Sequence, residues 1–564
     1  MIIAPPACSE IDCRFAQMNI GPSDRGLSSR SSMKCRLWFL HILQFIGLCI
    51  VLAVFLAAQD TVRATVSAAG QSAAPITNLT KNDFSVKDAG KPRTLTAFTA
   101  PDVKKPASEK LKANEYSNFP DLREADGAIF VVLDTVHTPY TDERDARMQI
   151  LKFLAKAAQA KHAITLAIID EKALHVFHDY RTGSDVLLAA LVKSGLGGLK
   201  GVTPPPAVDE AQVNREAARL TAFSKGENAN PAPPEQMRFF VDLPMHMFEE
   251  VALAAYGLPG RKMLVWVTNE VPFDIDPKTR QFKSPLQSSH GVAVNGAAVG
   301  GTKEVLSSAD VKKLMPLWHR SIRSLFDAGV AVYPVEVRGS SSAGSASFTL
   351  EAMKTLAQMT GGKALYGSND PFPDVFAAST ANSAGYSLTY AADAATGTDF
   401  RPVEVSVDQA AVQLIQSAGY FPYEGTPKSR AGEEVGMAMH SALQFTGILF
   451  NVEVTGFEDS AAGKKKANLV ITLPGDSGIV NETAGSVDVG LVAEAVNAAG
   501  QKVGTMNEGA GGKFQPEQVA QIKEAGFQLK RSFEVAPGEC TVHLVIGDNQ
   551  TGRTGDVVFP MTVK

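Results

Sequence analysis

Residues 128–134, AIFVVLD, form a continuous apolar run that ends in an aspartate. Such a run is typical of a strand buried on both faces of a sheet. Residues 141–160 follow with apolar positions at helical spacing. Further apolar runs alternate with helical patterns at 164–170, 174–180, 263–269 and 330–337. This alternation predicts an α/β domain over residues 126–370, with a parallel sheet and helices on both faces.

Two insertions interrupt this predicted domain. Residues 200–237 are rich in Pro and Ala, and residues 273–305 are rich in Gly, Ser and Val. Loops on a rigid scaffold commonly carry binding residues. For residues 200–237 the composition is equally compatible with a disordered spacer.

Shorter alternating patterns flank the predicted domain. Residues 76–101 alternate around the turn sequence DAGK, which predicts a β-hairpin. Two strands do not fold stably alone, so we expect partners from the β-type residues 385–425 in a small, split β-sandwich. Residues 434–564 alternate and break at Gly or Asn, which predicts a C-terminal immunoglobulin-like β-sandwich.

The N-terminal region has a different character. Residues 1–36 form a polar leader, and residues 37–58 contain no Lys, Arg, Asp or Glu. The apolar stretch is long enough to span a bilayer, so it predicts a signal peptide or a transmembrane anchor. Met33 opens the sequence MKCRLWFL, a natural signal-peptide start. Residues 59–75 are predicted to be a linker, with a small-residue pattern for cleavage at 66–68.

Composition agrees with a folded protein outside the cytoplasm. The chain has 564 residues, five cysteines and a net charge of −5. Four cysteines precede residue 50, so the exported part cannot form an intramolecular disulfide. Cys540, which alternates with apolar residues, is predicted to be a small core residue rather than a reactive thiol. We expect no nucleic-acid partner, since no basic stripe with interleaved aromatic residues is present.

Several segments, taken together, resemble a known family. They are LTKNDFSVKDAGKPRTLTAF, VVLDTVHTPYTDERDARMQILKFL, GRKMLVWVTNEVP, AGVAVYPVEVRG, LAQMTGGKALYGSND, YSLTY and AGYF. The chain is thereby similar to bacterial proteins with a von Willebrand factor A (VWFA)-related domain, first recognised in acidobacteria. The resemblance covers roughly residues 76–425, and it implies a Rossmann-like sheet in an exported protein.

The resemblance also implies a metal-ion-dependent adhesion site, in a degenerate form. Asp134 matches the first carboxylate, Thr138 matches the second hydroxyl, and Asn269 stands where the last aspartate belongs. Val136 replaces the first hydroxyl residue, and Thr203 matches the later threonine only weakly. Mg²⁺ requires near-octahedral oxygen ligation, so any Mg²⁺ or other divalent cation is expected to bind weakly or not at all.

Another interpretation of these residues needs no metal. A strand-end aspartate accepts backbone N–H bonds and fixes the turn that follows, and this is the interpretation that we favour for Asp134. Asp142 fits a helix N-cap. His137 lies in the same loop, but no second His or Cys is placed to join it in binding a metal.

The predicted function is an exported or membrane-tethered interaction module that binds a protein of the cell envelope or outside the cell. The alternative is a structural envelope scaffold without a ligand. We expect no enzyme and assign no catalytic residue, because the sequence contains no G-x-S-x-G, H-E-x-x-H or P-loop motif.

Overall fold

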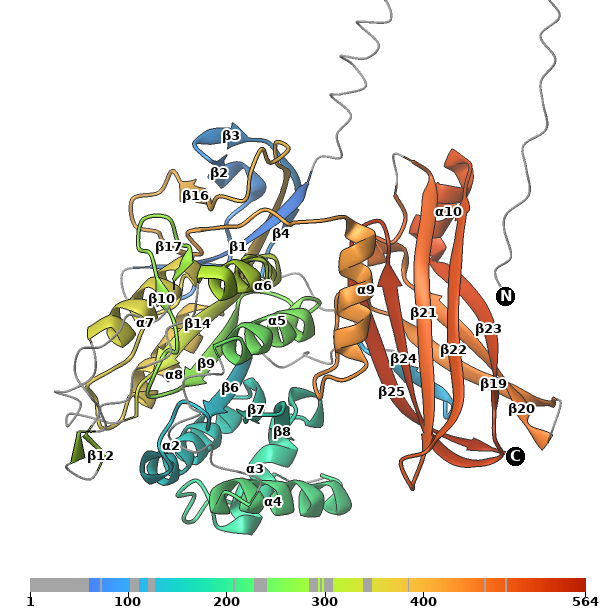
Figure 1. The fold of residues 1–564 in the computed structure, drawn as a ribbon, viewed down its shortest axis with the longest axis horizontal. Coiled ribbons are helices and arrows are strands. Elements are labelled where there is room, and N and C mark those ends of the chain that lie inside the picture. Colours follow the sequence, from blue (N-terminus) through green and yellow to red (C-terminus); the bar gives the residue numbers. More distant parts are fainter. Residues whose placement is uncertain are drawn as a thin grey trace, which may run out of the picture. The chain divides into compact units, whose positions relative to one another are not determined.

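The computed structural model describes residues 60–70, 74–101, 111–119, 127–205, 208–227, 241–283, 293–294, 297–298, 308–337, 347–383, 385–460, 463–481 and 484–564. These residues all belong to one compact unit, Asp60–Lys564, drawn in colour in Figure 1. Met33 and the apolar segment 37–58 lie outside the described residues. Among the helices in the described ranges, none is both long and apolar enough to cross a bilayer.

A five-stranded sheet forms the centre of the α/β part. Its strands are β6 (Ala128–Asp134), β7 (Ala163–Ile169), β8 (Leu174–His178), β9 (Lys262–Val267) and β14 (Val330–Val335). Their spatial order is β14-β9-β6-β7-β8. Strand β6 pairs in parallel with β7 and β9, and β9 pairs in parallel with β14. Strand β8 is antiparallel to β7, because the short connection at 170–173 cannot make a parallel crossover.

Helices cover both faces of this sheet (Figure 1). They are α2 (Tyr140–Gln159), α3 (Ser184–Ser194), α4 (Glu210–Lys225), α5 (Leu243–Ala255), α6 (Ser308–Ala328), α7 (Ser347–Thr360) and α8 (Phe372–Ala381). Successive side chains of a strand point to opposite faces. Accordingly, Phe130 and Val132 of β6 pack with α5, α6 and α7, whereas Val131 and Leu133 pack with α2, α3 and α8.

Two antiparallel four-stranded sheets adjoin the α/β part. One contains β17 (Gln413–Gln416), β1 (Thr61–Ala69), β15 (Gly385–Ala391) and β4 (Leu95–Thr99). The other contains β18 (Gly419–Tyr420), β16 (Arg401–Val407), β2 (Phe84–Asp88) and β3 (Lys91–Arg93). Side chains from both sheets share one apolar core. The predicted pairing of the early strands with residues 385–425 is confirmed, since β2 pairs with β16 and β4 with β15.

Two predictions about the early strands need correction. The hairpin within 76–101 consists of β2 and β3 alone, joined at Ala89 and Gly90, which both have positive φ. Strand β4 crosses to the other sheet. Residues 59–75 are not a simple linker, because β1 pairs with β15 on one side and with β17 on the other. The expected cleavage pattern at 66–68 therefore lies inside a buried strand.

The insertions also contain regular structure. Helix α4 occupies much of 200–237, so the spacer interpretation is wrong for that part. Its Glu216 lies 2.6 Å from the Nδ1 atom of the buried His178 on β8. The second insertion holds β10 (Asp274–Ile275), β11 (Phe282–Lys283), β12 (Ala293–Val294) and β13 (Ala297–Ala298) as short hairpins.

The C-terminal region forms an eight-stranded antiparallel sheet. After α9 (Pro427–Ala438), it comprises β19 (Asn451–Asp459), β20 (Lys465–Leu473), β21 (Ser486–Asn497), β22 (Lys502–Lys513), β23 (Phe527–Val535), β24 (Gly538–Asp548) and β25 (Thr554–Val563), with α10 (Pro516–Ala525) between β22 and β23. The eighth strand, β5 (Glu115–Ser117), comes from the charged stretch before β6, and the order is β25-β24-β21-β22-β23-β20-β19-β5. The Tyr116 hydroxyl donates to the Pro560 carbonyl at 2.9 Å, so the two end strands approach each other.

The predicted fold class is therefore wrong. Of the six sheets in the described residues, five are wholly antiparallel and the central one is mixed. The C-terminal region is one nearly closed sheet rather than an immunoglobulin-like pair of sheets. The chain is a mixed α/β protein with mostly antiparallel sheets, and not a Rossmann-like VWFA domain in a β-sandwich. Local alternation predicts strands, but it does not specify which distant strands pair.

Candidate functional site

The carboxyl ends of β6 and β9 bring the predicted site residues to one edge of the central sheet. Strand β6 ends at Asp134, and Asn269 follows the end of β9 by two residues. Because these strands are parallel neighbours, the loops after them leave the sheet at the same edge. Thr138 lies in the loop between Asp134 and α2. All three residues therefore lie at the carboxyl edge of β6 and β9.

Asp134 is fully buried and its carboxylate accepts bonds from four donors. Oδ1 accepts from the backbone N–H groups of Val136 and His137, at 3.1 and 2.9 Å. Oδ2 lies 2.8 Å from Nδ1 of His137 and 3.1 Å from Nε1 of Trp266. These bonds fix the turn after β6, in agreement with the structural interpretation of Asp134.

Two other polar atoms of this loop are buried without hydrogen-bond partners among the described residues. Since a carboxylate only accepts, Nδ1 of His137 donates to Asp134, which leaves Nε2 of a neutral ring as an acceptor. This Nε2 atom and Oγ1 of Thr138 have no hydrogen-bond partner within the described ranges. An Asp–His pair of this kind orients an imidazole, but no nucleophilic side chain contacts Nε2 in the part of the chain that the structure describes.

Asn269, in the loop after β9, forms hydrogen bonds with α2 and with the segment after β14. Its Nδ2 donates to Oδ2 of Asp142 at 2.6 Å, and its Oδ1 accepts from the backbone N–H of Val337 at 3.1 Å. Asp142 is not the N-cap that the sequence suggested, because α2 begins at Tyr140 with Pro139 in the cap position. It lies instead in the first turn, where the helix dipole favours a negative charge.

The neighbouring Glu143 links the same turn to α4 through Arg147. It is buried and pairs with Arg147 at 2.9 Å, while Arg147 donates to the Phe223 carbonyl of α4 at 3.0 Å. Burial raises the pKa of Glu143 above its ordinary value, and Arg147 opposes that shift. The first turn of α2 is thus held by the sheet on one side and by α4 on the other.

This arrangement does not fit a divalent cation. Both oxygens of Asp134 and the amide oxygen of Asn269 already accept bonds from protein donors, so that of the three predicted ligands only Thr138 has an unused oxygen. Val136 is buried and apolar, and Thr203 is exposed. Within the described ranges no group of three or more His, Cys, Asp or Glu side chains could hold a metal ion.

Two exposed tyrosines lie at this edge of the sheet. Tyr140, at the start of α2, is 66% exposed, and Tyr366 is 44% exposed. Leu365 forms a parallel bridge with Val335 at the end of β14, so Tyr366 also leaves the carboxyl end of the sheet. Large exposed aromatic side chains on a fixed backbone are typical of protein interfaces.

Sequence reasoning missed the role of Trp266. A buried indole N–H usually finds an acceptor, and Trp266 lies beside β6 in a strand whose other residues after Lys262 are apolar. That requirement was a signal for a polar partner at the end of a neighbouring strand, and the partner is Asp134. Tyr140 was missed because its exposure depends on where α2 begins.

Comparison with known proteins adds no family to this description: no family model matches the chain, and no curated protein matches it.

Proposed function

We propose that this chain is a protein-interaction module that uses the carboxyl edge of the central sheet and needs no metal ion. The observation that carries the proposal is the exposure of Tyr140, which follows a turn whose backbone N–H groups donate to the buried Asp134. An aromatic side chain on a backbone that is already held loses less conformational freedom on binding than one on a mobile loop, so it contributes more to affinity. Tyr366 extends the same surface toward β14.

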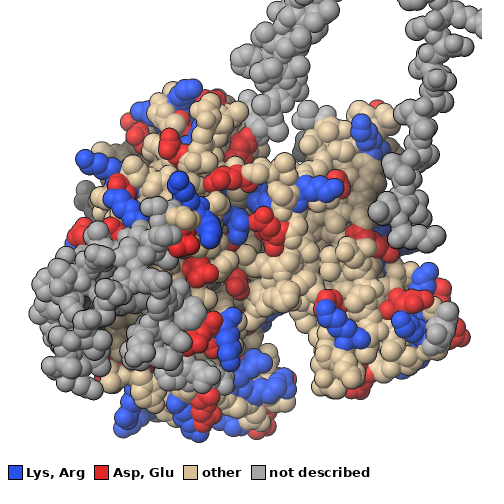
Figure 2. Space-filling model, viewed as in Figure 1, with Lys and Arg blue, Asp and Glu red and all other residues tan. Residues whose placement is uncertain are grey.

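The proposed partner is a protein of the cell envelope or outside the cell. Residues 37–58 support this location, because their length and composition suit export or anchoring. On the face drawn in Figure 2, basic and acidic side chains are interspersed over the described surface. A surface of mixed charge suits a protein partner better than nucleic acid.

Site-specific photo-crosslinking in the envelope fraction tests this function. A photoreactive phenylalanine analogue replaces Tyr140, and in a matched chain it replaces Phe119, which is also exposed but lies beside β5. We expect position 140 to give a discrete adduct that Tyr366→Ser weakens severalfold, since a second anchor at the same edge is lost. Equal adducts from positions 140 and 119, or none from 140, would contradict the proposal.

A further inference from the structure

Strands β22 and β23 are neighbours that barely pair. They share a single register pair, Gly504 with Val535, near one end. Each pairs fully on its other side, β22 with β21 and β23 with β20. Along 505–513 and 527–534 the facing edges therefore have no strand partner among the described residues. Helix α10 joins the two strands at the far end of this open seam.

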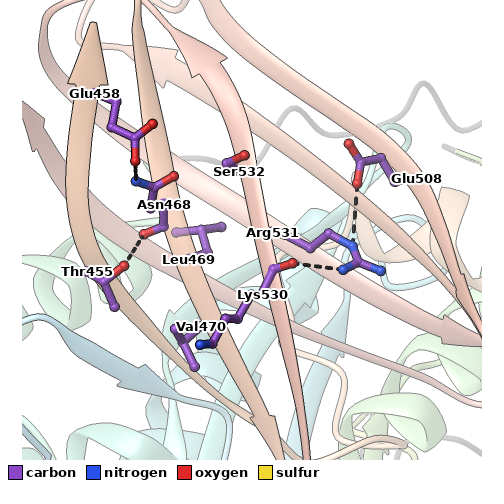
Figure 3. Close-up of a pocket in the computed structure, with 9 residues that line it drawn as sticks. All are labelled: Thr455, Glu458, Asn468, Leu469, Val470, Glu508, Lys530, Arg531 and Ser532. Carbon is purple, nitrogen blue, oxygen red and sulfur yellow. Dashed lines mark hydrogen bonds and ion pairs between the residues drawn. The ribbon is translucent and has the colours of Figure 1, made fainter.

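A hollow of about 530 Å³ lies beside the seam. In Figure 3 its lining runs from Thr455 and Glu458 on β19, across β20 and β23, to Glu508 on β22. The residues from the two middle strands are Asn468, Leu469, Val470, Lys530, Arg531 and Ser532. The hollow is open and mostly polar, which suits an extended chain better than a compact apolar ligand.

The two cationic side chains of the hollow, Arg531 and Lys530, differ in their engagement with acidic groups. Arg531 donates to the Lys530 carbonyl at 2.8 Å, and its Nε lies 3.4 Å from Oε2 of Glu508, so this pair loosely bridges the seam. Glu458 accepts from Asn468 at 2.9 Å. Lys530 is exposed, and no ion pair engages it within the described ranges. An acidic group is therefore the complement that this part of the lining lacks.

Strand β22 is also rich in glycine, with glycines on both of its faces. Gly509 and Gly512 are exposed, and a Cβ at Gly509 would meet nothing closer than 3.9 Å. The chain itself therefore does not require glycine there. Glycine inside a strand weakens it, and it often marks a place where another backbone approaches closely.

We propose that the seam between β22 and β23 binds an extended peptide segment of another protein, which adds as a strand and places an acidic side chain at Lys530. Unpaired backbone N–H and C=O groups supply the affinity in such strand addition, and side-chain pockets supply the specificity. The free edges, the glycines and Lys530 each support the same occupant. This site is separate from the carboxyl edge of the central sheet.

Peptide binding to the full chain in detergent tests the proposal. The probes are two libraries of random peptides, each about ten residues long, with a central Glu in one and a central Lys in the other. We expect binders from the Glu library, measured by fluorescence anisotropy. Lys530→Glu should weaken them about tenfold, since an attraction becomes a repulsion. Lys428→Glu, an equal charge change on exposed α9, should leave the affinity within about twofold.

A second measurement examines the backbone. Methylation of alternate peptide nitrogens should abolish binding, and the bound peptide should slow amide exchange in 505–513 and 527–534. The proposal is overturned if neither library binds, if Lys530→Glu has no effect, or if methylation and amide exchange show no involvement of these strands. Self-association of the chain that a peptide cannot displace would assign the seam to a second copy, and would also overturn it.

Discussion

Asp134 shows how one buried carboxylate determines the geometry of a whole loop. Its four donors come from the loop backbone, from His137 and from Trp266 on the neighbouring strand. Removing the carboxylate leaves all of these donors buried and unsatisfied, which costs far more than the loss of a surface group.

We therefore expect Asp134→Ala to lower the free energy of unfolding by about 3 kcal/mol or more. Asp145→Ala, an exposed change in the first half of α2, should shift it by less than about 0.5 kcal/mol. Urea unfolding of both variants measures the difference. Equal stability of the two would refute the role of Asp134 in fixing the turn.

Glu434 on α9 makes stability depend on pH. Burial raises its pKa to about 8, with a contribution from Glu249, and Arg430 opposes the shift. The folded chain therefore keeps a proton that the unfolded chain releases. The resulting stabilisation is complete below the unfolded pKa near 4.5 and is lost as the pH rises through about 8.

Between about pH 5 and pH 8 this group should lower the free energy of unfolding by up to about 1.4 kcal/mol per pH unit. Glu434→Gln should remove that slope, whereas Glu517→Gln on exposed α10 should retain it. Thermal unfolding across this range distinguishes them. An unchanged slope in Glu434→Gln would show that another group titrates.

At the scale of elements, the pattern of apolar and polar residues predicts a strand well where that strand depends mainly on its own segment. The apolar run 128–134 is β6 with the same bounds, because every residue of it is buried. Helix α4 was missed although Val213, Ala217 and Leu220 have helical spacing, since the flanking prolines suggested a spacer. Strand β1 was missed because its small residues also fit a cleavage region. The short β5 lies in a charged stretch and has no local signal.

The position of β1 restricts N-terminal processing. Its residues pair with strands on both sides, so a cut at 66–68 would remove most of one strand from the middle of a sheet. We expect any mature N-terminus to precede Thr61, and N-terminal sequencing of the protein isolated from its cells determines it. A mature chain that begins at residue 69 would contradict this assignment of β1.

At the scale of the whole molecule, distant segments complete one another's sheets. Strand β5 and the buried Asn118 join the C-terminal sheet, where Asn118 donates to the Ile448 carbonyl and accepts from the Phe450 N–H, both at 2.8 Å. The sequence could not predict this, because strand register between distant segments is set by tertiary packing. For the same reason it predicted the C-terminal strands but not their single sheet. Asp134, Thr138 and Asn269 lie at or just after the ends of β6 and β9, but their bonding partners were not predictable from spacing.

The pairing of β1 and β4 with β15, and of β2 with β16, has a consequence for biogenesis. A chain that emerges from its amino end presents three early strands, β1, β2 and β4, that pair with strands made only after the entire α/β part. Throughout that interval apolar edges stay open to misassociation with other chains. We therefore expect correct folding of these sheets to depend on a chaperone that holds the early strands or on rapid synthesis. We expect a chain truncated within the α/β part to aggregate rather than to form a smaller folded protein.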